Sequence, residues 1–199
     1  MDYFALYKPF GMLSQFTREA PGQHTLADLG FAFSKDVYPV GRLDADSEGL
    51  LLLTNDKSLN AKLLHPKFAH ARSYLAQVEG VPDSLALKRL AEGVEIRVEG
   101  KTYRTQPAVV RLLDAPPELP ERHPPVRFRK TVPDRWLEIT LTEGKNRQVR
   151  RMCAAVGYPV LRLVRIKIGG LQLGDMTPGE VRSIPPALLQ ALWGSGPER

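Results

Sequence analysis

The chain has 199 residues, with 28 lysines and arginines against 22 aspartates and glutamates, so its formal net charge is +6. This length suffices to bury a hydrophobic core without staples, and the single cysteine excludes an internal disulfide and a zinc site built from several thiolates. The positive charge is compatible with a polyanionic partner but does not by itself indicate one, because many basic proteins bind no nucleic acid.

The N-terminal segment 3–7 is aromatic and β-prone, and Lys8-Pro9-Phe10-Gly11 follows it, which predicts a strand that runs into a turn. Asp2 stands where a signal peptide would have basic residues, and no segment approaches the roughly 20 apolar residues of a membrane span. We therefore expect a soluble, cytoplasmic protein without a membrane partner. Lys8 is a candidate phosphate contact, although an isolated surface lysine is more often merely solvated.

The polar loop 41–49 leads into Leu50–Leu53, a leucine run that predicts a short strand buried on both faces. Loops fixed to such a scaffold commonly carry functional groups. This one contains Arg42 and three acids: Asp44, Asp46 and Glu48. For Asp46 and Glu48 a solvated turn that caps backbone donors is the favoured interpretation, whereas for Asp44 a structural and a chemical role are equally compatible with the pattern.

Regular spacing of apolar residues predicts most of the remaining elements. Helices are expected at 25–33 with Thr25 near its cap, after Asp56 up to His65, from Pro82 to Gly93 along Leu85, Leu87 and Leu90, and from Pro185 to Trp193. Strands are expected at 71–80, 136–141 and 160–171, with a hairpin made by 94–98 and a long second arm at 102–113. The proline-rich segment 114–134 is expected to be an exposed loop, and 194–199 to fray. In that loop Arg127, Arg129 and Lys130, interleaved with Phe128, are candidates for a contact with a polyanion such as a nucleic acid, or for a solvated basic surface.

A basic cluster lies where the chain enters a second helix. Val149, Met152, Cys153 and Val156 recur at helical spacing and share one face of a helix that ends at Gly157. This leaves four cations at its first turns: Lys145, Arg147, Arg150 and Arg151. The helix dipole disfavours cations there, so a phosphate or carboxylate partner is favoured over a solvated face.

Three motifs in the chain resemble those of the RNA pseudouridine synthases of the small-subunit-A type. They are Gly41-Arg42-Leu43-Asp44 with the following 47–56, Lys8-Pro9-Phe10-Gly11, and the run Gly144–Arg151. The resemblance implies that Asp44 is the catalytic residue and that Arg150 is its ion-pair partner. It also implies that Tyr74, otherwise an ordinary sheet aromatic, stacks on a flipped uracil, and that Leu163 lies against the site.

The resemblance covers nearly the whole chain and implies the pseudouridine synthase fold. We therefore expect an α+β protein with a mixed, largely antiparallel sheet that is split by a catalytic cleft and flanked by short helices. Residues 1–199 would form a single catalytic domain of two lobes, without an N-terminal S4-type RNA-binding module, because Lys8-Pro9 comes too early to leave room for one. Gln15-Phe16-Thr17 resembles the branch that acts on large-subunit rRNA.

The implied reaction is the isomerisation of a uridine to pseudouridine in 23S rRNA by a monomer that uses neither a cofactor nor a metal. Without an accessory module the catalytic domain itself must bind the phosphates. The candidates are Lys8, Arg42, Lys145, Arg147, Arg151, Arg165 and Lys167, of which Arg165 and Lys167 share one face of the strand 160–171.

Two questions stay open at this level. Asp44 can attack C1′ of the ribose or remove the C2′ proton, and the sequence does not decide between these roles. A non-catalytic rRNA-binding or ribosome-assembly protein on the same fold is the main alternative, while a nucleoside hydrolase is disfavoured because neither a metal-binding acidic cluster nor a second acid is evident.

Overall fold

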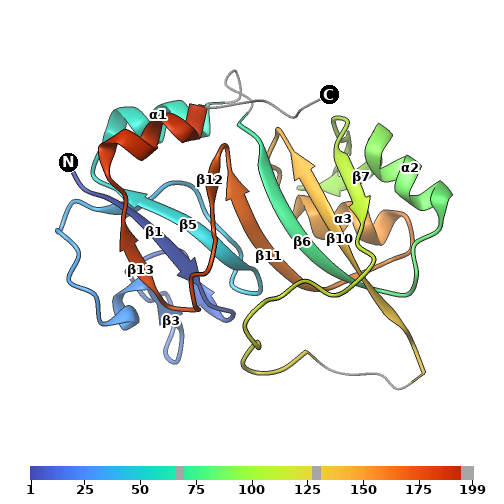
Figure 1. The fold of residues 1–199 in the computed structure, drawn as a ribbon, viewed down its shortest axis with the longest axis horizontal. Coiled ribbons are helices and arrows are strands. Elements are labelled where there is room, and N and C mark those ends of the chain that lie inside the picture. The colour runs from blue at the N-terminus through green and yellow to red at the C-terminus, as the bar shows by residue number, and fades with distance from the viewer. Residues whose placement is uncertain (66–69, 127–130, 194–199) are drawn as a thin grey trace. The chain divides into compact units, whose positions relative to one another are not determined.

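The computed structural model describes residues 1–65, 70–126 and 131–193 (Figure 1). The described chain divides into two compact units: unit 1 comprises residues 1–65, His70 and 165–193, and unit 2 comprises 71–126 and 131–164. Strand β11 (Val160–Ile168) contributes to both, because the division falls between Val164 and Arg165. The predicted α+β class with a mostly antiparallel sheet is confirmed.

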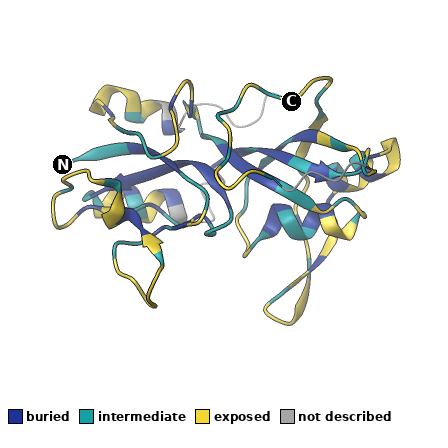
Figure 2. Cartoon of the chain, turned by 90° about the horizontal axis from the view of Figure 1, so that it is seen from below, coloured by how far each residue is buried: buried dark blue, intermediate teal, exposed yellow. Residues whose placement is uncertain are grey.

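Unit 1 is built on the leucine strand. Its sheet contains β1 (Tyr3–Lys8), β4 (Tyr38–Pro39), β5 (Glu48–Thr54), β12 (Leu171–Gln172) and β13 (Val181–Ser183). Strand β1 pairs antiparallel with β5 on one side and with β13 on the other. Every residue of β5 is buried, which confirms the predicted two-faced burial. Buried residues, dark blue in Figure 2, make up long stretches of several strands. Glu48 belongs to this strand and is 1% exposed, so the solvated turn expected for it is wrong.

The helices of unit 1 are short. They are the 3₁₀ helices η1 (Leu26–Leu29) and η3 (Pro186–Trp193) and the helix α1 (Lys57–Leu64), beside a small parallel pair, β2 (Met12–Leu13) with β3 (His24–Thr25). Asp56 caps α1 by accepting from the backbone of Ser58 and Leu59, and His65 ends it, as predicted. The helix predicted at 25–33 is only one turn, because Gly30 adopts a left-handed conformation and the following Phe31 and Phe33 pack edge-on against Phe4.

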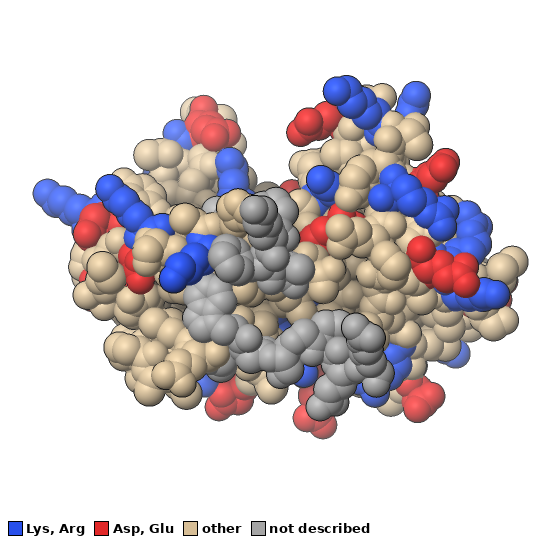
Figure 3. All heavy atoms as spheres, turned by 90° about the horizontal axis from the view of Figure 1, so that it is seen from above, with Lys and Arg blue, Asp and Glu red and all other residues tan. Residues whose placement is uncertain are grey.

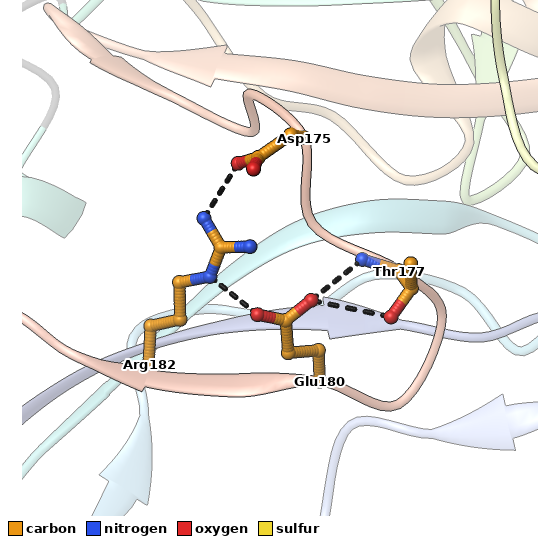
Figure 4. A network of polar contacts seen from close by, with 4 residues as sticks. All are labelled: Asp175, Thr177, Glu180 and Arg182. Atoms are coloured by element: carbon orange, nitrogen blue, oxygen red, sulfur yellow. Dashed lines mark hydrogen bonds and ion pairs between the residues drawn. The ribbon is translucent and has the colours of Figure 1, made fainter.

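The connection from β12 to β13 is held by a surface network (Figure 4). Arg182 donates to Asp175 at 2.6 Å and also to Glu180, whose carboxylate accepts from the Thr177 backbone N–H at 2.9 Å. The hydrogen bond from Arg182 holds the pKa of Glu180 below its ordinary value. Because these groups are exposed, the network fixes the turn geometry more than it adds stability.

Unit 2 packs two helices against an antiparallel sheet. Its strands are β6 (Arg72–Glu79), β9 (Val109–Leu112) and β10 (Asp134–Leu141) with the start of β11, and its helices are α2 (Ser84–Glu92) and α3 (Gln148–Ala155). The core joins Leu137 and Ile139 of β10 to Leu90 of α2 and Met152 of α3. Leu85 of α2 is 64% exposed, and the buried residues of this helix are Ala86 and Leu90.

The predicted hairpin is shorter than expected. Strands β7 (Glu95–Val98) and β8 (Lys101–Arg104) pair, but the second arm stops before Thr105, and β9 pairs with β10 instead. Pro107 has no N–H to extend the ladder, and the Ala108 N–H donates to the Ala91 carbonyl oxygen at 2.9 Å. The strand predicted at 160–171 is likewise split, because Gly169 turns the chain between β11 and β12.

The proline-rich segment forms no helix or strand at 113–126 or 131–133, which agrees with the predicted loop. Arg127, Phe128, Arg129 and Lys130, proposed as an RNA contact, lie outside the described residues, as does the tail 194–199. Within the part of the chain that is described, no helix has the length and apolar character to cross a membrane.

Candidate active site

The backbone around Asp44 is fixed from both sides within unit 1. Ser14 and Leu43 bond reciprocally: the Leu43 N–H donates to Ser14 Oγ at 3.0 Å, and that hydroxyl donates to the Leu43 carbonyl oxygen at 2.9 Å. On the other side the Ser47 N–H donates to the Asp44 carbonyl oxygen at 3.0 Å, and the Gly11 N–H donates to the Ala45 carbonyl oxygen at 2.7 Å. The half-buried Asp44 side chain therefore projects from a pinned loop.

Lys8 supports this loop from inside. It is fully buried, and its ammonium donates to the carbonyl oxygens of Met12 at 2.6 Å, Pro9 at 2.9 Å and Ala45 at 3.4 Å. Burial lowers the pKa of Lys8 to about 8, although three nearby carboxylates favour its charged form: Glu48, Asp46 and Asp44. The phosphate contact considered for Lys8 does not fit this placement, because the ammonium is buried and its donors are directed at backbone carbonyls.

Arg165 is also internal. It is 4% exposed, and its Nε donates to the Leu50 carbonyl oxygen at 2.8 Å, so it contacts the leucine strand. The expected exposed phosphate contact does not match this position. Lys167 on the same strand is half-buried opposite Gln172, and Arg42 is exposed with its guanidinium donating to Gln15 Oε1 at 2.9 Å.

Tyr74 lies in unit 2, opposite Ile139 in the β6–β10 pair. Its ring is half-buried and packs against the hydrophobic core, which also contains Leu163 at 5% exposure. The core environment expected for a sheet aromatic is therefore present, and the stacking role of Tyr74 stays a prediction.

The basic segment, defined as residues 143–151, links β10 to the first turn of α3. Arg147 precedes the helix with a left-handed φ of 51°, a conformation that is uncommon for a residue with a side chain. Arg151 donates to the carbonyl and side-chain oxygens of Asn146 at 3.0 and 2.9 Å. Arg150 is half-buried and donates to the Val160 carbonyl oxygen at 3.2 Å, which directs it toward β11.

The predicted site residues are divided between the units. Unit 1 holds Lys8, Arg42, Asp44, Arg165 and Lys167, and unit 2 holds Tyr74, Lys145, Arg147, Arg150, Arg151 and Leu163. Within unit 1, Asp44 and Arg165 both lie close enough to Lys8 to affect its pKa. The pairing of Asp44 with Arg150 stays a prediction.

Three residues that were not predicted from the sequence each hold a backbone segment next to a candidate residue: Ser14, Glu143 and Gln148. The sequence did contain a sign that Gln148 is buried, because this polar residue stands directly before the apolar face of the helix. For Ser14 and Glu143 the partners are distant in sequence. Among the described residues, no group of three or more His, Cys, Asp or Glu side chains is arranged to hold a metal ion.

The chain matches the family model described as RNA pseudouridylate synthase over residues 2–155. Ribosomal large subunit pseudouridine synthase E of Xanthomonas axonopodis pv. citri is 52% identical over 87% of this chain and 88% of its own. The protein of the same name from Vibrio parahaemolyticus is 51% identical over 89% of this chain and 71% of its own. A solved structure described as a pseudouridylate synthase superposes with a TM-score of 0.77 and 28% identity, covering 96% of this chain and 73% of that one.

Proposed function

Since the chain belongs to the RNA pseudouridylate synthase family, we propose that it converts one uridine of large-subunit (23S) ribosomal RNA to pseudouridine, with Asp44 as the essential carboxylate. The observation that carries the assignment of Asp44 is its loop. Hydrogen bonds on both sides of Asp44, and the buried Lys8 beneath it, hold the backbone from which the carboxylate projects. Such fixed positioning is what a catalytic group needs.

The reaction needs no external reactant, because the product is an isomer of the substrate. The uridine first leaves its stack, at a cost of a few kcal/mol. The carboxylate then attacks C1′ or removes the C2′ proton as the bond to N1 breaks, much as carboxylates support an oxocarbenium-like centre in glycosidases. The uracil rotates and rejoins the sugar through C5, which releases the carboxylate from C1′ in the first case or is accompanied by return of the proton to C2′ in the second. The C5 proton is then lost while N1 gains one.

Two residues of unit 2 complete the proposed chemistry. Arg150 would pair with the Asp44 carboxylate, and Tyr74 would stack on the flipped uracil, with Leu163 beside it. Base–aromatic stacking contributes on the order of 1–3 kcal/mol. The phosphates would be bound by exposed or half-buried cations: Arg42, Lys145, Arg147, Arg151 and Lys167.

We further propose that the described chain acts as one catalytic domain, as a monomer in the cytoplasm, and without a cofactor. The relatives' names, which refer to the large ribosomal subunit, support the choice of ribosomal RNA as the substrate.

The assignment is tested by Asp44→Asn, which keeps the side-chain shape and removes the charge. Pseudouridine formation should fall by about a thousandfold or more, measured by mass spectrometry of cyanoethylated 23S rRNA after incubation with pure protein. Asp46→Asn, in the same loop, is the matched control and should retain most of the activity. Clear turnover by Asp44→Asn would remove it as the catalytic group, and wild-type protein that binds the rRNA without modifying it would support a non-catalytic binding protein.

A further inference from the structure

Glu143, an acid inside the basic segment, accepts hydrogen bonds from three separate parts of unit 2. Its Oε2 accepts from the Tyr103 hydroxyl of β8 at 2.5 Å, and its Oε1 accepts from the Gln106 N–H at 2.8 Å and from Gln148 Nε2 at 2.6 Å. The bond to Glu143 raises the pKa of Tyr103 to about 12. The carboxylate thus joins β8, the chain after β8 and the first residue of α3.

Gln148 closes the segment into a compact ring. Its side chain is buried, and while its Nε2 donates to Glu143, its Oε1 accepts from the Lys145 N–H at 2.9 Å. The backbone N–H of Gln148 also donates to the Lys145 carbonyl oxygen at 3.1 Å. The Gln148 side chain therefore joins the start and the middle of the stretch 143–148 to its end. Arg147 lies within this stretch in its left-handed conformation.

Tyr103 makes a second contact with this ring. Lys145 Nζ lies 4.6 Å from the centre of the Tyr103 ring, a cation–π distance, while the hydroxyl of the same tyrosine donates to Glu143. Lys145 is exposed in this position, so its charge remains accessible to a phosphate.

We propose that Glu143, acting with Gln148 and Tyr103, is a positioning residue that holds Lys145, Arg147 and Arg151 in the arrangement that binds RNA phosphates. This rests on the proposed function. An acid in a surface that binds a polyanion weakens that binding by its charge, so its benefit has to come from another effect. Pre-organising three flexible cations is such an effect, since ordering long side chains and a strained backbone on binding costs free energy.

Two Glu143 variants of equal charge separate the effect of its charge from the effect of its hydrogen bonds on the position of the cations. Glu143→Met and Glu143→Gln both remove one negative charge, but Met lacks strong acceptors. Gln retains an oxygen for Gln106 and Gln148, and its amide can donate to the Tyr103 oxygen if that hydroxyl turns round. Glu95→Gln, at an exposed position of β7 in the same unit, is the control for charge removal alone.

We expect Glu143→Met to bind a 23S rRNA transcript about three- to tenfold more weakly than wild type, a factor typical of lost hydrogen bonds. Glu143→Gln and Glu95→Gln should bind at least as tightly as wild type. For Glu143→Met the change should appear in KM rather than kcat, and the dependence of affinity on salt should flatten, because fewer cations reach phosphates together. A merely structural role would lower the melting temperature without altering that salt dependence.

If Glu143→Met and Glu143→Gln bind the transcript with the same affinity, the hydrogen bonds of Glu143 do not contribute to RNA binding. That result would overturn the positioning role. If Glu143→Met does not fold, Tyr103→Phe carries the test, because it removes one hydrogen bond and keeps the ring beneath Lys145. It should weaken binding about two- to fivefold, and unchanged binding would overturn the inference. Charge reversals at Arg147 and Arg151 test the proposed function separately: if they leave affinity unchanged, the segment does not bind RNA, whatever Glu143 does.

Discussion

Lys8 and Arg165 occupy positions in unit 1 that their residue types did not predict. Both are cations with under 5% exposure, and both direct donors to backbone carbonyls next to the loop 41–49 and the leucine strand. Buried charges are retained only when they are paired and hydrogen-bonded. Glu48 provides an opposing buried charge for Lys8. From residue type alone, lysine and arginine are expected at the surface. Only the folded structure shows that these two are internal.

The depressed pKa of Lys8 predicts a pH dependence of stability. Its pKa falls from an ordinary 10.5 to about 8 on folding, so between these values the unfolded chain binds more protons and stability rises with pH. The charged groups that face Lys8 are Glu48, Asp46, Asp44 and Arg165, and they remain in place in a variant that lacks only the ammonium. The stability of wild type relative to Lys8→Met should therefore increase from pH 8 to pH 10.

Urea denaturation of both proteins at pH 7, 8, 9 and 10 measures this difference, and comparison with the variant cancels the other titrating groups. A difference that stays constant across the series would mean that the Lys8 ammonium is not depressed in the folded protein.

At the scale of elements, the sequence predicted what local patterns determine. The strands around Leu50–Leu53, the cap of α1 by Asp56 and the apolar stripe of α3 follow from spacing and capping, and all are present. The prediction of a long second hairpin arm was wrong because β9 pairs with β10, whose residues lie about 27 positions further along the chain. Local sequence patterns do not reveal such a distant pairing. For the same reason the internal position of Arg165 depends on a strand 115 residues away.

A close backbone approach fixes the end of α2 and gives a prediction for that element. Gly93 has φ 90°, and a Cβ there would lie 2.3 Å from the Thr105 carbonyl oxygen, whereas Gly157, which follows α3 at φ 95°, would meet nothing within 4 Å. Both alanine variants carry the cost of a positive φ, about 1 kcal/mol, and only Gly93→Ala adds the clash.

We expect Gly93→Ala to lose about 2 kcal/mol or more beyond the loss of Gly157→Ala in free energy of unfolding, measured by denaturant titration. Equal losses would show that Thr105 moves aside without cost.

At the scale of the molecule, the net charge of +6 is modest and lies on a surface of mixed sign, since the face drawn in Figure 3 carries Lys and Arg among Asp and Glu. Two of the proposed phosphate contacts, Lys8 and Arg165, are buried and direct donors to backbone carbonyls instead. RNA affinity therefore has to come from a small number of local cations rather than from the overall field.

That restriction sets the expected salt dependence. If about four cations, drawn from Arg42, Lys145, Arg147, Arg151 and Lys167, each contact one phosphate, the log–log slope of affinity against salt is about −3. Affinity then falls roughly 50-fold between 50 and 200 mM salt.

Arg147→Glu should weaken binding and reduce the magnitude of the slope by the contribution of one contact, or roughly 0.7. Arg89→Glu, at an exposed position of α2, makes the same change in net charge and should leave the slope unaltered. Equal slopes for both reversals, measured by filter binding of an rRNA transcript across a salt series, would mean that net charge rather than the basic segment governs binding.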